Sequence, residues 1–212
     1  MTRLVAILAA IALVALLGGT AAYVWLGRGV DRFAACTAGT VTGDAAIGGD
    51  FTLVDETGRT VTAAEVVDRP TLIYFGYTFC PDVCPLDAAR NARAVDLLAE
   101  RGHQVKPVFI TIDPARDTPA ILAEYTDYMH PDMLGLTGSP EQVREAAAAY
   151  RVYYARRGEE AETYLMDHTV FSYLVLPERG FVTLFRGAPG AQGAGVTAEE
   201  VADEAACYLE KA

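Results

Sequence analysis

The chain has 212 residues, of which 52% are hydrophobic and 21% charged, and its formal net charge is -11 at pH 7. This composition excludes a disordered chain and a polytopic membrane protein, and it fits one globular domain with one further apolar segment. The negative charge argues against nucleic acid as a partner, because phosphates would repel the domain.

The first element in chain order is an uncharged stretch from Leu4 to Leu26. As a helix rising about 1.5 Å per residue it would be roughly 35 Å long, more than the hydrocarbon core of about 30 Å. Tyr23 and Trp25 near its end are residue types that favour the membrane interface. The alternative is a cleaved signal peptide, whose apolar core is usually only about 7 to 15 residues long. We therefore predict a single transmembrane anchor over residues 1–28.

The next segment, residues 29–50, is rich in Gly, Ala and Thr and has no sustained apolar period, which predicts a flexible tether. The folded domain is expected to occupy residues 51–212. It starts with two short β-prone runs on either side of Glu56-Thr57-Gly58, which is the pattern of a hairpin.

Strands and helices then alternate. The β-branched and aromatic run 71–79 predicts a buried strand, residues 86–100 have helical spacing, and 105–112 predicts a second buried strand. Thr118-Pro119 and Ser139-Pro140 each open a helix, because a hydroxyl cap followed by proline is a helix-start signal.

The last part of the chain predicts a short strand near 152–157, a hairpin that turns at 177–180, and a helix capped by Thr197. The whole order describes an α/β fold with a central mixed sheet and helices on both faces.

Four cysteines divide into a close pair, Cys80 and Cys84, and a distant pair, Cys36 and Cys207. The close pair lies where a buried strand meets a helix start, whose backbone N–H groups favour thiolates, so both pKa values are expected to be lowered. Two thiolates suit Cu(I) and are acceptable to Zn(II). The residues alone leave three interpretations open: a redox-metal site, a dithiol redox catalyst, and a structural disulfide or zinc site.

Three histidines remain as candidate ligands. His103 is interpreted as a surface residue at a helix end. His130 precedes Pro131 at the end of a helix and has no ligand-type residue nearby, so it is not expected to bind a metal. His168 stands at the predicted mouth of a strand, from which a sheet can deliver it toward the cysteine pair. Asp167 is a candidate to orient its ring. Met166 is better explained by core filling than by a role as a fourth soft ligand.

Three blocks carry a resemblance to a known family: YFGYTFCPDVCP (74–85), FITIDPARDTP (109–119) and DHTVFSYLV (167–175). In this order, after an apolar N-terminal segment, they resemble the Sco/SenC copper proteins. The resemblance implies a thioredoxin-like domain whose copper ligands are Cys80, Cys84 and His168. Asp113 and Asp117 match the family's acidic loop near the site and are secondary candidates, with helix capping as the alternative.

The resemblance also implies a function and a location. It predicts a copper chaperone that assists assembly of the binuclear copper site of cytochrome c oxidase, with that oxidase subunit and a copper donor or thiol reductant as partners. The chain would be a single-pass protein of the bacterial inner membrane with its domain in the periplasm. In that oxidising compartment the remaining even pair suggests a disulfide between Cys36 and Cys207, with two buried thiols as the alternative.

An enzymatic alternative remains. Cys80 and Cys84 would be the redox-active dithiol of a membrane-anchored thiol-disulfide reductase acting on the oxidase subunit or on other envelope proteins. Redox motifs of this fold more often have two residues between the cysteines, so the spacing favours the carrier. A peroxiredoxin-like peroxidase fits the proline-flanked pair less well.

Overall fold

The structure is a computed structural model, and it describes residues 2–27, 33, 35–36, 47–160, 163–189 and 195–212. The chain divides into two compact units, Met1–Ala35 and Cys36–Ala212. The first contains α1 (Thr2–Gly27), a helix of 26 residues. Within the described residues, no helix combines the length and the apolar character needed to cross a membrane. The anchor predicted over residues 1–28 is therefore not confirmed and stays a prediction.

Most of the tether predicted over residues 29–50 lies outside the described residues. The described end of this segment, residues 47–50, is part of the second unit and packs against its core. Ile47 packs against the hydrophobic core, and the backbone N–H of Gly48 donates to the carbonyl of Ala149 at 2.8 Å. Contact with the folded domain thus begins before the predicted start at Phe51.

A disulfide joins Cys36 to Cys207, with an S–S distance of 2.08 Å and a Cα–Cα distance of 5.6 Å. The predicted bridge from the tether to the last helix is confirmed. Cys80 and Cys84 are free thiols.

A seven-stranded mixed sheet forms the centre of the second unit, in the order β2-β1-β5-β4-β3-β8-β9. Its middle strand β3 (Thr71–Gly76) runs parallel to β4 (Lys106–Thr111) and antiparallel to β8 (Ser172–Leu176). Every residue of these three strands is buried, which explains why their sequences are continuous apolar runs. The other strands of the sheet are β1 (Thr52–Asp55), β2 (Thr60–Thr62), β5 (Leu134–Thr137) and β9 (Gly180–Phe185).

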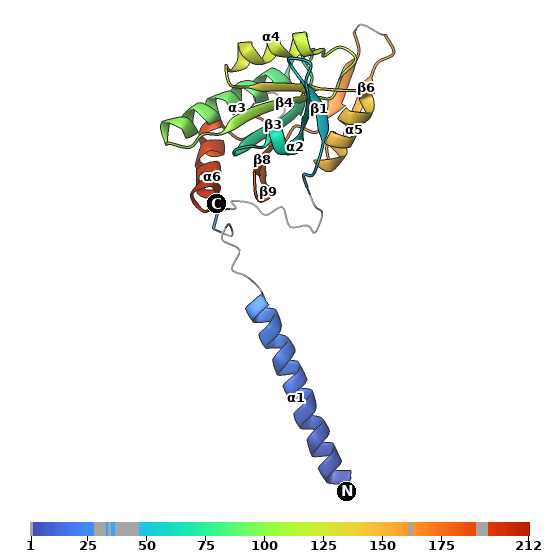
Figure 1. The fold of residues 1–212 in the computed structure, drawn as a ribbon, viewed down its shortest axis with the longest axis vertical. Helices are drawn as coiled ribbons and strands as arrows, with labels where there is room; N and C mark the ends of the chain where they lie inside the picture. Colours follow the sequence, from blue (N-terminus) through green and yellow to red (C-terminus); the bar gives the residue numbers. More distant parts are fainter. Residues whose placement is uncertain (1, 28–32, 34, 37–46, 161–162, 190–194) are drawn as a thin grey trace. The chain divides into compact units, whose positions relative to one another are not determined.

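Helices cover both faces of this sheet (Figure 1). The crossovers through α3 (Val83–Glu100) and α4 (Pro119–Met129) step across the sheet in the same direction, from β3 to β4 to β5. Right-handed connections therefore place both helices on one face. The last helix α6 (Ala198–Glu210) packs against α3, whereas α5 (Pro140–Ala149) lies on the other side of the sheet and contacts β1. The predicted α/β class with a mixed central sheet is confirmed.

Two further strands form a separate small sheet. β6 (Tyr154–Arg157) pairs antiparallel with β7 (Leu165–His168), and Tyr154 lies opposite His168. The sequence predicted the first of these strands but not the second. It also did not predict β5 or the single helical turn α2 (Ala63–Val66).

Candidate metal centre

The two free cysteines are placed by the end of β3 and the start of α3. Cys84 is the second residue of α3 and has no exposed surface, whereas Cys80 lies on the preceding loop and is half-buried. Gly76 ends β3 beneath them. A Cβ atom at this position would lie 2.8 Å from the Tyr74 ring, 3.0 Å from the Phe109 ring and 3.1 Å from Cys84 Sγ. Only glycine therefore leaves room for the buried sulfur.

His168 reaches the cysteines from the end of β7. Its Nδ1 lies 2.9 Å from the carbonyl oxygen of Thr169, and its Nε2 lies 3.3 Å from Cys84 Sγ. Because a carbonyl only accepts, Nδ1 carries the ring proton in the neutral imidazole, and the lone pair of Nε2 faces the sulfurs. The rings of Tyr74 and Tyr77 meet the imidazole edge-to-face, with centroid distances of 6.3 and 6.0 Å. The ring is thus held in a ligating orientation.

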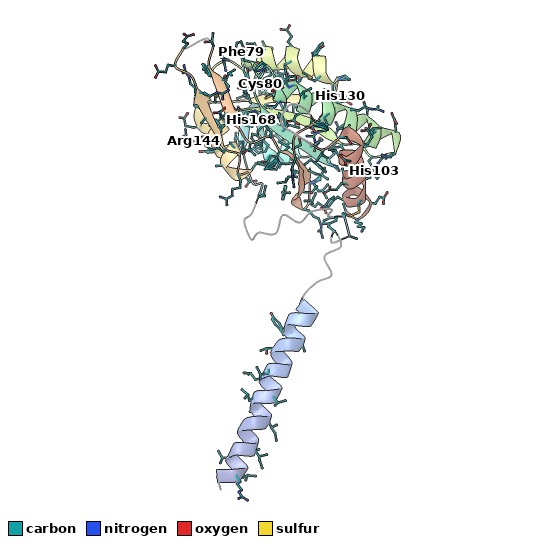
Figure 2. The ribbon with its side chains drawn as sticks, turned by 180° about the vertical axis from the view of Figure 1, so that it is seen from behind. Phe79, Cys80, His103, His130, Arg144 and His168 are labelled. Carbon is teal, nitrogen blue, oxygen red and sulfur yellow. A yellow bond between two sulfur atoms is a disulfide. The ribbon has the colours of Figure 1, made fainter. Side chains whose placement is uncertain are left out.

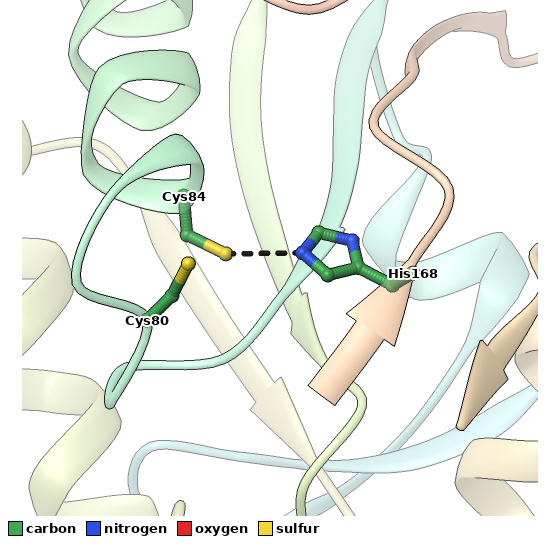
Figure 3. Close-up of side chains that lie close together, drawn as sticks. All are labelled: Cys80, Cys84 and His168. Carbon is green, nitrogen blue, oxygen red and sulfur yellow. Dashed lines mark hydrogen bonds between the residues drawn. The ribbon is translucent and has the colours of Figure 1, made fainter. Parts of the chain in front are cut away.

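The sulfurs of Cys80 and Cys84 and a ring nitrogen of His168 all lie within 4.8 Å of one another. Figure 3 shows both thiols and the imidazole pointing into one space. Metal–sulfur and metal–nitrogen bonds of about 2.3 and 2.0 Å place neighbouring ligand atoms roughly 3.5 to 4 Å apart, so small side-chain movements suffice to bind one ion. Among the described residues the cluster has three such ligands, whereas structural zinc sites almost always have four.

The two thiols differ strongly in acidity. Hydrogen bonding with the Cys84 thiol, together with the side chain of His168 and the backbone N–H groups of Asp82 and Cys84, lowers the pKa of Cys80 to about 3. Burial, followed by the bond to Cys80 and that sulfur's negative charge, raises the pKa of Cys84 far above its ordinary value. The prediction that both pKa values are lowered is therefore wrong for Cys84. The metal-free pair holds one proton, on the buried sulfur.

We expect Cys80 to be alkylated by iodoacetamide at nearly the same rate at pH 5 as at pH 8. With its pKa lowered to about 3, Cys80 stays a thiolate over this range. An ordinary thiol loses about tenfold in rate for each pH unit below its pKa. The measurement is mass-spectrometric alkylation of reduced, metal-free protein. Cys84→Ala removes the principal hydrogen bond and should restore pH dependence. A tenfold fall per unit in the unmodified protein would contradict the assignment.

The two acidic candidates, Asp113 and Asp117, support the site and do not lie among its ligands. Fully buried Asp117 accepts the backbone N–H and the hydroxyl of Thr78 at 3.1 and 2.6 Å, and the hydroxyl of Thr111 at 2.6 Å. Burial raises the pKa of Asp117 above its usual range. Asp113 accepts the Tyr164 hydroxyl at 2.6 Å. The helix-capping alternative is wrong for both, because Thr118 caps α4.

The proposed orienting role of Asp167 is also wrong. Side chains alternate along a strand, so Asp167 points away from the face that carries His168. Its carboxylate lies 3.5 Å from Arg157 Nη1 on the neighbouring strand. The carbonyl of Thr169 takes the orienting role instead.

The remaining candidates behave as expected. Met166 packs against the hydrophobic core. Figure 2 shows His103 apart from Cys80 and His168, and His130 Nε2 contacts Asp96 at 3.2 Å. Neither histidine belongs to a metal-ligand cluster within the described residues.

A cavity of about 390 Å³ opens beside the cluster, and its walls include Tyr77, Cys80, Arg157, Met166 and His168. A larger one of about 600 Å³ lies between residues 47–50 and β9, and none of its lining residues is a cysteine or histidine. The ligand chemistry, and not the size of the cavity, therefore locates the functional site.

A thioredoxin-like fold whose central strand leads to two free sulfurs and a facing imidazole defines a dithiol or soft-metal protein. The SCO1/SenC family profile matches residues 39–204, and the chain belongs to this family. Protein SenC of Rhodobacter capsulatus is 49% identical over 209 residues, which cover 99% of this chain and 91% of SenC. The predicted family is confirmed.

Two solved structures extend the comparison. ScoI of Arabidopsis thaliana with copper bound has a TM-score of 0.72 and 39% identity, and the match covers 79% of this chain and 100% of that one. ScoI of Bradyrhizobium japonicum with copper bound has a TM-score of 0.65 and 36% identity, with coverages of 77% and 99%. The fold of the second unit is thus that of copper-binding relatives.

Proposed function

We propose that this protein is a copper chaperone that holds Cu(I) or Cu(II) on Cys80, Cys84 and His168 and assists assembly of the binuclear copper site of cytochrome c oxidase. Family membership and the copper in the two relatives support the cargo. The observation that carries the proposal is the convergence of the three ligand atoms within 4.8 Å.

The donor set suits both oxidation states of copper. Thiolates are soft ligands that favour Cu(I), and a neutral imidazole accepts Cu(I) and Cu(II). Cys80 is the half-buried member of the pair, so a cysteine of the oxidase subunit or of a copper donor approaches on its side, while Cys84 stays enclosed. The cargo then moves by ligand exchange, and no substrate turnover is required.

The ligand assignment is tested by titrating the protein with Cu(I) in competition with a colorimetric chelator, and with Cu(II) followed by electron paramagnetic resonance. His168→Ala should lower copper affinity by at least about tenfold and remove nitrogen hyperfine coupling, since even an outer-shell change costs about 10- to 100-fold. Cys80→Ser and Cys84→Ser should each remove a thiolate charge-transfer band. His103→Ala is the matched control. Unchanged affinity in His168→Ala would refute the three-ligand site.

A thiol-disulfide reductase is the second candidate, favoured by one observation. Cys80 is an accessible thiolate and Cys84 a buried thiol, which is the arrangement of an attacking and a resolving cysteine. Cys80 would attack a partner disulfide to form a mixed disulfide, and Cys84 would then displace the partner's thiolate as Cys80–Cys84 closes. Under this alternative His168→Ala would retain activity toward an oxidised oxidase-subunit peptide, while Cys80→Ser would lose it.

We further propose that α1 anchors the domain on the periplasmic side of the bacterial inner membrane. The supports are the uncharged sequence from Leu4 to Leu26 and the exposure of its aliphatic side chains, from 57% at Ile7 to 70% at Val14. A disulfide between Cys36 and Cys207 fits an oxidising compartment. The full chain should stay in the membrane pellet after an alkaline carbonate wash, and a chain starting at residue 36 should not. Release of the full chain by the wash would contradict the anchor.

A further inference from the structure

The hairpin that carries His168 is not part of the main sheet. Within the part of the chain that the structure describes, β6 and β7 form a sheet of their own, and a two-stranded hairpin is at best marginally stable in water. His168 stays opposite the cysteines only while this hairpin is held against the rest of the domain. The contacts between the hairpin and the rest of the domain therefore decide whether His168 lies within reach of a metal ion bound by the cysteines.

The side chain of Arg116 contacts both the hairpin and the cysteine loop. Its guanidinium Cζ lies 3.6 Å from the ring centroid of Tyr164 and 4.5 Å from that of Phe79, and the Tyr77 ring is at 5.8 Å. Tyr164 immediately precedes β7, and Phe79 immediately precedes Cys80. The guanidinium of Arg156 in β6 also lies over the Tyr164 ring, at 4.1 Å from its centroid. We call Arg156, Tyr164, Arg116 and Phe79 the stack, because each of them contacts the next by a guanidinium–ring interaction.

Polar contacts fix the guanidinium within this stack. Arg116 Nε donates to Asp113 Oδ2, and Nη1 donates to the carbonyl of Tyr164 at 3.0 Å. The Tyr164 hydroxyl donates to the other oxygen of the same Asp113. Nη2 is buried and has no hydrogen-bond partner among the described residues. The Arg116 side chain is 18% exposed and its charge is paired with Asp113, so its contacts with the two rings add to an ion pair that is largely shielded from water.

We propose that Arg116 is a positioning residue that clamps the β6–β7 hairpin onto the Cys80 loop and thereby brings His168 to the two sulfurs. This inference rests on the proposed copper function for its consequence, but the clamp itself exists in the metal-free protein. Lysine cannot replace arginine here, because only a planar guanidinium stacks on two rings while its N–H groups bond in the plane.

The clamp is tested without metal by hydrogen–deuterium exchange of the full chain, read on peptides that cover residues 152–170. Arg116→Ala should speed exchange of the β6 and β7 amides by about tenfold relative to α3. Arg116→Lys should resemble Arg116→Ala more than the unmodified protein. Arg144→Ala is the matched control, because Arg144 is exposed on α5 and pairs only loosely with Glu141 at 3.8 Å. Unchanged exchange in Arg116→Ala would overturn the inference.

The consequence for the ligand is tested by copper titration of the same variants. Arg116→Ala should lose about 10- to 100-fold in copper affinity and most of the nitrogen hyperfine coupling, but keep the thiolate charge-transfer bands. Faster exchange with unaltered affinity and coupling would also overturn the positioning role. If the unmodified protein binds no copper, the proposed function fails while faster exchange still supports the clamp.

A second variant, with a smaller expected effect on stability, tests the proposal if Arg116→Ala does not fold. Phe79 is 50% exposed, so Phe79→Leu removes one ring of the stack at little cost to the core. It should change exchange and coupling in the same direction by a smaller amount. If Phe79→Leu and Arg144→Ala were indistinguishable in exchange, the stack would not act as a clamp.

Discussion

Replacing Cys36 and Cys207 together by serine is expected to lower the free energy of unfolding by about 5 kcal/mol. The bridge joins residues 171 apart, and in the chain-entropy model closing so long a loop removes that much freedom from the unfolded chain. The midpoint of thermal unfolding should fall by roughly 10–20 °C. The measurement is denaturant unfolding of the second unit, with Cys80 and Cys84 left intact.

Reduction offers an independent control for this prediction. In dithiothreitol the unmodified protein should fall to the stability of the double variant, and the variant itself should not change. Cys80 and Cys84 are reduced in both samples, so they contribute nothing to the difference in stability between them. A double variant as stable as the unmodified protein without reductant would show that the bridge is not formed or does not constrain the unfolded chain.

Asp117→Ala is expected to destabilise the domain by about 3 kcal/mol and to weaken metal binding as well. The substitution removes the acceptor of the part-buried N–H and hydroxyl of Thr78 and of the buried hydroxyl of Thr111. Each unsatisfied buried donor costs about 1–3 kcal/mol, partly recovered by relaxation. Thr78 stands two residues before Cys80, so the released loop no longer fixes that sulfur. Denaturant unfolding and Cu(I) competition measure the two effects.

Asp117→Asn separates the effect of the negative charge from the effect of side-chain shape, because Asn has nearly the same shape as Asp and is neutral. The amide keeps one acceptor oxygen at nearly the same position, and its N–H groups can donate to a threonine hydroxyl, so less than half of the loss is expected. Asp96→Ala, a partly exposed carboxylate on α3, serves as the matched surface control. If Asp117→Ala bound Cu(I) with unchanged affinity, Asp117 would serve stability alone.

The sequence predicted the parts of the fold that repeat a local period. The continuous apolar runs of β3 and β4 and the helical spacing of α3 were visible because burial on both faces, or on one face, leaves that pattern. β5 was not visible, because Leu134–Thr137 is four residues long and contains a glycine. β7 was missed for a similar reason, since two of its four residues are Asp167 and His168.

The site was predictable in its ligands but not in its electrostatics. The pairing of His168 with the cysteines came from the family resemblance, because residues 84 apart leave no local pattern. The pKa of Cys84 was expected to be lowered because the residue stands at a helix start. Burial raises this pKa instead, and the depth of burial follows from tertiary packing, which has no local sequence pattern. The orienting role expected for Asp167 was wrong because β7 was not predicted. Alternation of side chains along β7 points Asp167 away from the face that carries His168. The contacts of Arg116 left no signal in the sequence, because Phe79 and Tyr164 lie far from it along the chain.

The distance along the chain between Cys84 and His168 makes the metal centre a product of tertiary structure. Neither α3 nor the β6–β7 hairpin holds all three ligands, so a peptide of either one would reproduce only part of the site. A bound ion would therefore stabilise the native state by mass action, by about 2.7 kcal/mol at a free concentration of a hundred times its dissociation constant. Local unfolding of the β6–β7 hairpin would in turn remove His168 from the metal ion. Retention of copper would therefore depend on the stability of the fold.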